Sequence, residues 1–140
     1  DGPIPGGVAL DGVEIIPPTW DRSAIYSLYG QADCFVLPSR LETWGDVFLE
    51  AMSFGLPVIV AEADGTQKDL VTADNGWMIP AEDQAALTNR LETAINDIPR
   101  LRKMGAASFD IASRINIEGM VETFQQAVQT AIADYHPEKS

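Results

Sequence analysis

The sequence predicts an α/β domain built on a doubly wound parallel sheet and followed by C-terminal helices. Up to residue 80, short apolar runs bounded by Pro and Gly alternate with longer helical patterns, which is typical of parallel strands joined by crossover helices. After residue 80 only helical spacing remains. The chain has 140 residues, of which 46% are hydrophobic, so we expect one core and a single domain over 1–140.

Four short apolar runs are expected to be buried strands, because they are rich in β-branched or aromatic residues and end at turn residues. They are "VEII" (13–16), "CFVLP" (34–38), "PVIVA" (57–61) and "GWMIP" (76–80). Between the first two, residues 20–31 place Ile25, Leu28 and Tyr29 on one helical face. Thr19 is the expected N-cap of that helix.

Helices are expected at four further places. One runs from about Asp46 to Phe54, where nearly every residue is apolar. Two more cover residues 81–97 and 99–114, the second starting with Pro99, which suits a first helical turn. The last, about 116–135, has apolar residues at four-residue steps and therefore needs a partner surface: Met120, Phe124, Val128 and Ile132.

Charge and rare residues exclude several classes of function. The formal net charge of -12 repels polyanions, so neither nucleic acid nor anionic lipid is an expected partner. Cys34 is the single cysteine; it has no partner for an internal disulfide and is expected in the core. His136, the single histidine, lies in a polar tail, so no histidine triad or multi-histidine metal site is expected within the chain. No cofactor is expected either. No apolar run is long enough to be a membrane span.

The stretch "LETWGDVFLEAM" (41–52) holds two glutamates with seven residues between them. Glu42 is expected in a loop after a strand, Gly45 at the joint, and Glu50 inside the next helix. In an open parallel sheet, ligands bind beyond the carboxyl ends of the strands, and the free N–H groups of the following helix attract phosphate. Glu50 would then accept hydrogen bonds from sugar hydroxyls, with Glu42 nearer the group beyond the phosphate.

Spacing alone leaves a second interpretation of these acids open. Asp46, Glu50 and Ser53 share one helical face, and that face could simply be solvated. Glu42 would then be an ordinary loop acid.

The run "ADCFVLPSRLETWGDVFLEAMSFGLPVIVAEADG", followed by "NGWMIPAEDQAAL", resembles the C-terminal, nucleotide-sugar-binding domain of the retaining GT-B glycosyltransferases of group 1, glycosyltransferase family 4. The resemblance rests on five features found in order over residues 32–80: a Pro-Ser strand end, the two spaced glutamates, Glu-Ala-Met, Gly-x-Pro-Val and a later Gly-x-x-x-Pro. It implies a Rossmann-like sheet.

The resemblance also implies an activity. This activity is the retaining, hexosyltransferase-like transfer of a sugar from a nucleotide-diphosphate sugar to a glycan or lipid-linked acceptor, without a metal. The implied process is polysaccharide biosynthesis, and the implied location of the intact protein is the cytoplasm, including the periphery of the inner membrane. By position, one residue would contact the transferred sugar as the catalytic group and the others would bind the donor. These are Glu42 for catalysis, Glu50 for the ribose, Gly45, Asp46 and Val47 for the diphosphate, and Thr19 near the base.

Two departures and two alternatives accompany the resemblance. Asp46 stands where the family commonly has an apolar residue, and Lys68 where a glutamate is common. The sequence begins "DGPIPGG" without methionine, so we expect a truncated domain that lacks its first two strands, its basic clamp and the acceptor domain, and that is inactive alone. A non-catalytic binding domain and a GT-B-related epimerase or phosphorylase remain the alternatives.

Overall fold

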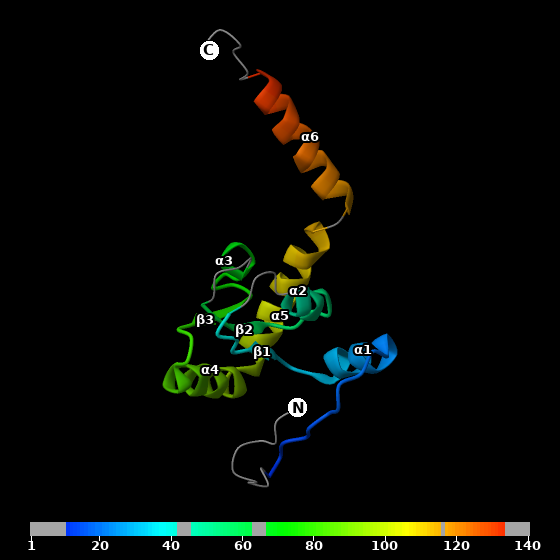
Figure 1. Ribbon diagram of the computed structural model, residues 1–140. Coiled ribbons are helices and arrows are strands. Elements are labelled where there is room, and N and C mark those ends of the chain that lie inside the picture. The colour runs from blue at the N-terminus through cyan, green and yellow to red at the C-terminus, as the bar shows by residue number, and fades with distance from the viewer. Residues whose placement is uncertain (1–10, 42–45, 63–66, 116, 134–140) are drawn as a thin grey trace.

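The computed structural model describes residues 11–41, 46–62, 67–115 and 117–133 and contains a three-stranded parallel sheet (Figure 1). The strands follow the order of the sequence: β1 (Phe35–Leu37), β2 (Val58–Ala61) and β3 (Gly76–Ile79). In register, Phe35 lies opposite Val58, and Val58 lies opposite Gly76. Three of the four expected strands are therefore confirmed.

The helices occupy most of the remaining described chain. They are α1 (Arg22–Gln31), α2 (Asp46–Ser53), α3 (Gln67–Leu70), α4 (Gln84–Asn96), α5 (Ile98–Arg114) and α6 (Ile117–Ala133). All the helices expected from the sequence are confirmed to within a few residues, and the short helix α3 is an addition.

Helices cover both faces of the sheet, as a doubly wound fold requires. On one face, Phe48 and Met52 of α2 and Ala112 of α5 pack against Val58 and Val60. On the other face, Ile59, Ala61 and Ile79 pack against Ala86 and Leu87 of α4. All four residues of β2 are buried, because this strand is central and its side chains alternate between the two cores. The expected fold class is confirmed.

The expected strand at 13–16 is wrong. The backbone there forms no strand, and Val13 and Ile15 are 56% and 68% exposed. A strand is stable only when a neighbouring strand takes up its N–H and C=O groups. Among the described residues, β1 pairs with β2 alone, so "VEII" meets no such neighbour.

The start of α1 also differs from expectation, because Asp21 is the N-cap in place of Thr19. The Asp21 carboxylate accepts hydrogen bonds from the Ser23 N–H at 2.9 Å and the Ser23 hydroxyl at 2.7 Å. These two bonds lower the pKa of Asp21 below its usual value. Thr19 supports the same turn from outside, since its Oγ1 accepts from the Asp21 N–H at 3.1 Å.

Helix α6 projects away from the rest of the fold (Figure 1), and three apolar residues of its stripe are partly or largely exposed. Phe124 and Ile132 are both 70% exposed, and Val128 is 41% exposed. The partner surface expected for this stripe is not supplied by the described residues.

Cys34 is partly buried and packs against the cluster of Ile59, Ala61 and Ile79. Burial, with a smaller contribution from the charge of Asp33, raises the pKa of its thiol to about 11. A thiol in such a site behaves as a small apolar side chain, as expected from the sequence.

We expect folded Cys34 to react with iodoacetamide at pH 8 about 100-fold more slowly than a free thiol of pKa about 8.5, because the thiolate is the nucleophile. Mass spectrometry can measure this directly, since the chain holds one cysteine. The same chain unfolded in urea is the control. Equal rates in the folded and unfolded chain would contradict the assignment of Cys34 to the core.

Candidate functional site

Helix α2 carries the candidate site at the carboxyl end of the sheet. It follows β1 in the chain, so its first turn lies at the edge where the parallel strands end. Phe48, Ala51 and Met52 are fully buried and fix one side of the helix against the sheet and α5. The opposite side is exposed and includes Asp46 and Glu50. Free N–H groups at the helix start and a carboxylate one turn further along can together bind a phosphorylated sugar.

Glu50 is approached by α1. The Tyr29 hydroxyl lies 3.3 Å from Glu50 Oε2 and 3.4 Å from the carbonyl oxygen of Val47. Partial burial raises the pKa of Tyr29, and the charge and hydrogen bonding of Glu50 raise it further. The pKa of Arg22, at the start of α1, is raised mainly by its hydrogen bond to Tyr26. The charges of Tyr26 and Glu50 raise it further. One side of Glu50 is therefore bordered by polar groups of α1.

The structure describes four of the six expected site residues, and three of these four lie together. Asp46, Val47 and Glu50 lie together on the first two turns of α2. Val47 is 42% exposed, because it points away from the face that packs on the sheet. Thr19 is exposed before α1 and bonds within its own turn. Glu42 and Gly45 lie outside the described residues.

Tyr29 is the site residue that sequence reasoning assigned only to an apolar face. Its partner Glu50 is 21 positions away, so the contact depends on how α1 docks on α2 and not on any local pattern. One signal was present: a phenol on a half-buried helix face usually finds a polar partner for its hydroxyl.

A second feature of the carboxyl edge is an ion pair between the ends of β1 and β3. Arg40 Nε lies 2.7 Å from Glu82 Oε1, with both side chains mostly exposed. Glu82 has a positive φ of 63°, which is unusual for a residue with a side chain. Next to this pair is a small hollow of about 180 Å³ at the strand ends. Its lining includes Pro38, Ala61, Ile79, Pro80, Glu82 and Asp83.

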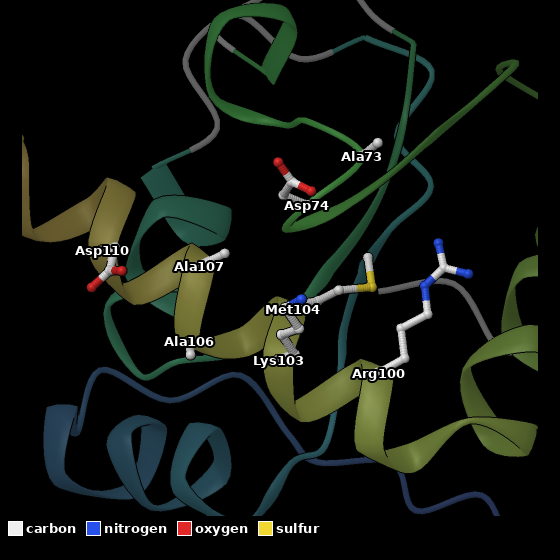
Figure 2. Close-up of a pocket in the computed structure, with 8 residues that line it drawn as sticks. All are labelled: Ala73, Asp74, Arg100, Lys103, Met104, Ala106, Ala107 and Asp110. Atoms are coloured by element: carbon white, nitrogen blue, oxygen red, sulfur yellow. The ribbon is translucent and has the colours of Figure 1, made fainter.

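A larger hollow lies elsewhere, between α5 and the turn before β3. Figure 2 shows Asp74 on that turn, with Arg100 and Lys103 on α5. Its volume is about 740 Å³, but the turn leads into β3 and so marks the amino end of the sheet. None of the expected site residues lines it. The candidate site is assigned to the carboxyl edge, because that is where open parallel sheets bind ligands.

Comparison with known proteins decides the family. The model of the glycosyl transferases group 1 family matches residues 9–110, which include all three strands and α2. The chain belongs to the group 1 glycosyltransferases. A D-inositol 3-phosphate glycosyltransferase of Stackebrandtia nassauensis is 30% identical over 108 residues, which cover 77% of this chain and 24% of that protein. The chain thus spans about a quarter of the length of this relative.

Solved structures agree with this glycosyltransferase assignment. The HepE protein of Anabaena, in complex with UDP, is 25% identical and has a TM-score of 0.68; the match covers 78% of this chain and 30% of the HepE chain. Sucrose-phosphate synthase from Thermosynechococcus elongatus is 26% identical and has a TM-score of 0.66; the match covers 80% of this chain and 28% of the synthase chain. Both support the Rossmann-like fold of the GT-B enzymes.

Two negative findings apply to the described part of this glycosyltransferase chain. Within it, no group of three or more His, Cys, Asp or Glu side chains is arranged to hold a metal ion. No helix there has the length and apolar character needed to cross a membrane.

Proposed function

We propose that this glycosyltransferase chain binds the donor, a nucleotide-diphosphate sugar, at the carboxyl edge of its sheet. The observation that carries the proposal is the position of Glu50, exposed one turn into α2 and bordered by α1 in a chain of this family. The UDP in the HepE structure, whose fold this chain shares, supports the same class of ligand. The acceptor would be a glycan or a lipid-linked sugar, and the anomeric configuration would be retained.

The roles of the residues follow from their places on α2. The N–H groups of Asp46 and Val47 belong to the first turn and have no intrahelical acceptor, so they can bind the diphosphate. Glu50 accepts hydrogen bonds from the ribose hydroxyls. For Glu42, which is not on α2, the resemblance to the family supports contact with the transferred sugar. The Asp46 carboxylate is exposed and turns aside when the diphosphate binds, because like charges repel.

Local dipoles are needed because the chain as a whole is acidic. With a net charge of -12, its long-range field repels a nucleoside diphosphate. The helix start offsets this repulsion at close range. Stabilisation of the leaving diphosphate by fixed N–H groups and basic side chains, with the acceptor brought close to the donor sugar, would then lower the barrier to transfer.

Replacing Glu50 by alanine in the full-length protein tests the proposal. We expect donor affinity to fall by about 1–3 kcal/mol, the range for losing a hydrogen bond to a charged group. Isothermal titration with UDP, GDP and ADP measures this and identifies the base. Glu92→Ala, an exposed acid on α4, is the matched control and should leave the dissociation constants unchanged. Equal affinity in the Glu50→Ala variant and the wild type would exclude the assigned role.

A further inference from the structure

The ring of Tyr29 is held between two neighbouring elements. Its centroid lies 6.1 Å from that of Phe35 on β1 and 5.3 Å from that of Phe54 at the end of α2, with tilted geometry in both pairs. Aromatic contacts at these distances are favourable and orient the ring. The position of the Tyr29 hydroxyl is therefore set by packing on both sides of its ring.

That hydroxyl reaches α2 at two points, Glu50 Oε2 at 3.3 Å and the Val47 carbonyl oxygen at 3.4 Å. Both distances exceed the usual 2.7–2.8 Å of an O–H···O bond, so each contact is a long one, and the single phenolic proton can point to either acceptor. The Val47 carbonyl belongs to the helix backbone and keeps the hydroxyl close to α2. The hydroxyl can thus restrain the Glu50 carboxylate on one side without occupying all of its acceptor sites, of which a carboxylate has about four.

We propose that Tyr29 is a positioning residue that holds the Glu50 carboxylate ready to accept the ribose hydroxyls of the donor. The inference rests on the proposed function, since it assigns Glu50 to the ribose. Pre-organisation of this kind improves affinity because the side chain loses less freedom on binding. Its effect is specific: it strengthens binding of a ribose with hydroxyls more than binding of a ribose without them.

Tyr26 provides a matched control on the same helix. Its ring also lies 5.3 Å from that of Phe54, but its hydroxyl accepts a hydrogen bond from Arg22 at 3.3 Å. Tyr26→Phe and Tyr29→Phe each remove one phenolic hydroxyl from α1 and keep the ring. In the described structure only the second removes a hydrogen bond to Glu50.

The experiment compares these two variants in the full-length protein. The probes are whichever of UDP, GDP and ADP binds tightest and the 2′,3′-dideoxy form of that nucleotide. We expect Tyr29→Phe to raise the dissociation constant of the ribonucleotide about fivefold and that of the dideoxynucleotide less than twofold. Tyr26→Phe should change both less than twofold, and thermal melts should show that both variants fold.

The results that would contradict the role of Tyr29, the role of Glu50 and the proposed function differ from one another. If Tyr29→Phe weakens both nucleotides equally, or weakens neither, while Glu50→Ala still weakens the ribonucleotide, Tyr29 only packs and the positioning role is wrong. If Glu50→Ala has no effect, the assignment of Glu50 to the donor fails, and the role of Tyr29 fails with it. Absence of binding by all three nucleotides would overturn the proposed function itself.

Discussion

Replacing Gly105 by alanine is expected to lower the free energy of unfolding of the 140-residue chain by about 3 kcal/mol, the upper part of the range for overpacking a tight contact. A Cβ added at Gly105 would clash with the carbonyl oxygen of Gly55 and lie 3.3 Å from Pro57 Cδ. The first of these atoms is backbone, and Gly55 itself has a φ of +74°, a conformation that side chains disfavour. A backbone oxygen cannot relieve the clash by a rotamer change, so α5 must move away from the end of α2.

Urea denaturation followed by helical circular dichroism measures the change, and Gly30→Ala is the matched control. A Cβ at Gly30 would meet no atom within 4 Å. Because Gly30 is in α1 and alanine is the better helix former, we expect that variant to be as stable as the wild type or up to about 1 kcal/mol more stable. Similar effects of the two substitutions would show that the α2–α5 crossing tolerates added volume.

This crossing also matters for the candidate site. Gly55 follows the end of α2, and its amide donates to the Met52 carbonyl at 2.9 Å. Contact with α5 therefore fixes the far end of the helix whose first turn carries Asp46 and Glu50. Loss of that contact should tilt α2 and weaken donor binding in the full-length protein, even though Gly105 is remote from the ligand.

The pattern of apolar residues predicted a strand correctly where the strand is buried on both faces. Three of the four residues of β2 are β-branched, and all four are buried because both faces of that strand are covered, so pattern and environment agree. "VEII" has a similar local pattern yet is exposed, because strand formation also needs a paired neighbour that sequence composition does not reveal. The start of α1 was misplaced for a related reason: Thr19 and Asp21 are both suitable caps, and the chain's path selects between them.

The candidate site was predictable only in part. Helical spacing placed Glu50 and Asp46 on one face of α2, and in the structure both are exposed. The contact with Tyr29 was not predictable, because it joins two helices through tertiary packing. The roles of Glu42 and Gly45 remain predictions that follow from their spacing and from the family.

The second large loss of stability is expected on substitution of Asn75, which is fully buried. Its Oδ1 accepts from the Thr72 N–H at 2.6 Å, and its Nδ2 donates to the Leu70 carbonyl at 3.1 Å. Its own carbonyl accepts from the Ser108 hydroxyl at 3.2 Å. The side chain therefore shapes the turn that leads into β3 and links it to α5.

Asn75→Asp should lower the free energy of unfolding by about 4 kcal/mol at pH 7, because it replaces a donor by a buried carboxylate facing the Leu70 carbonyl. Burial raises the folded pKa of the introduced carboxyl above its unfolded value of about 3.9. The neutral acid can still donate to Leu70, so the deficit relative to wild type should be smallest below pH 4 and grow as the pH rises through the raised pKa. Urea denaturation at several pH values measures this difference. The control is Asn89→Asp at an exposed site on α4, whose free energy of unfolding should stay within about 0.5 kcal/mol of wild type. A deficit that is small at pH 7, or that does not depend on pH, would show that water reaches this side chain and that the turn does not depend on its hydrogen bonds.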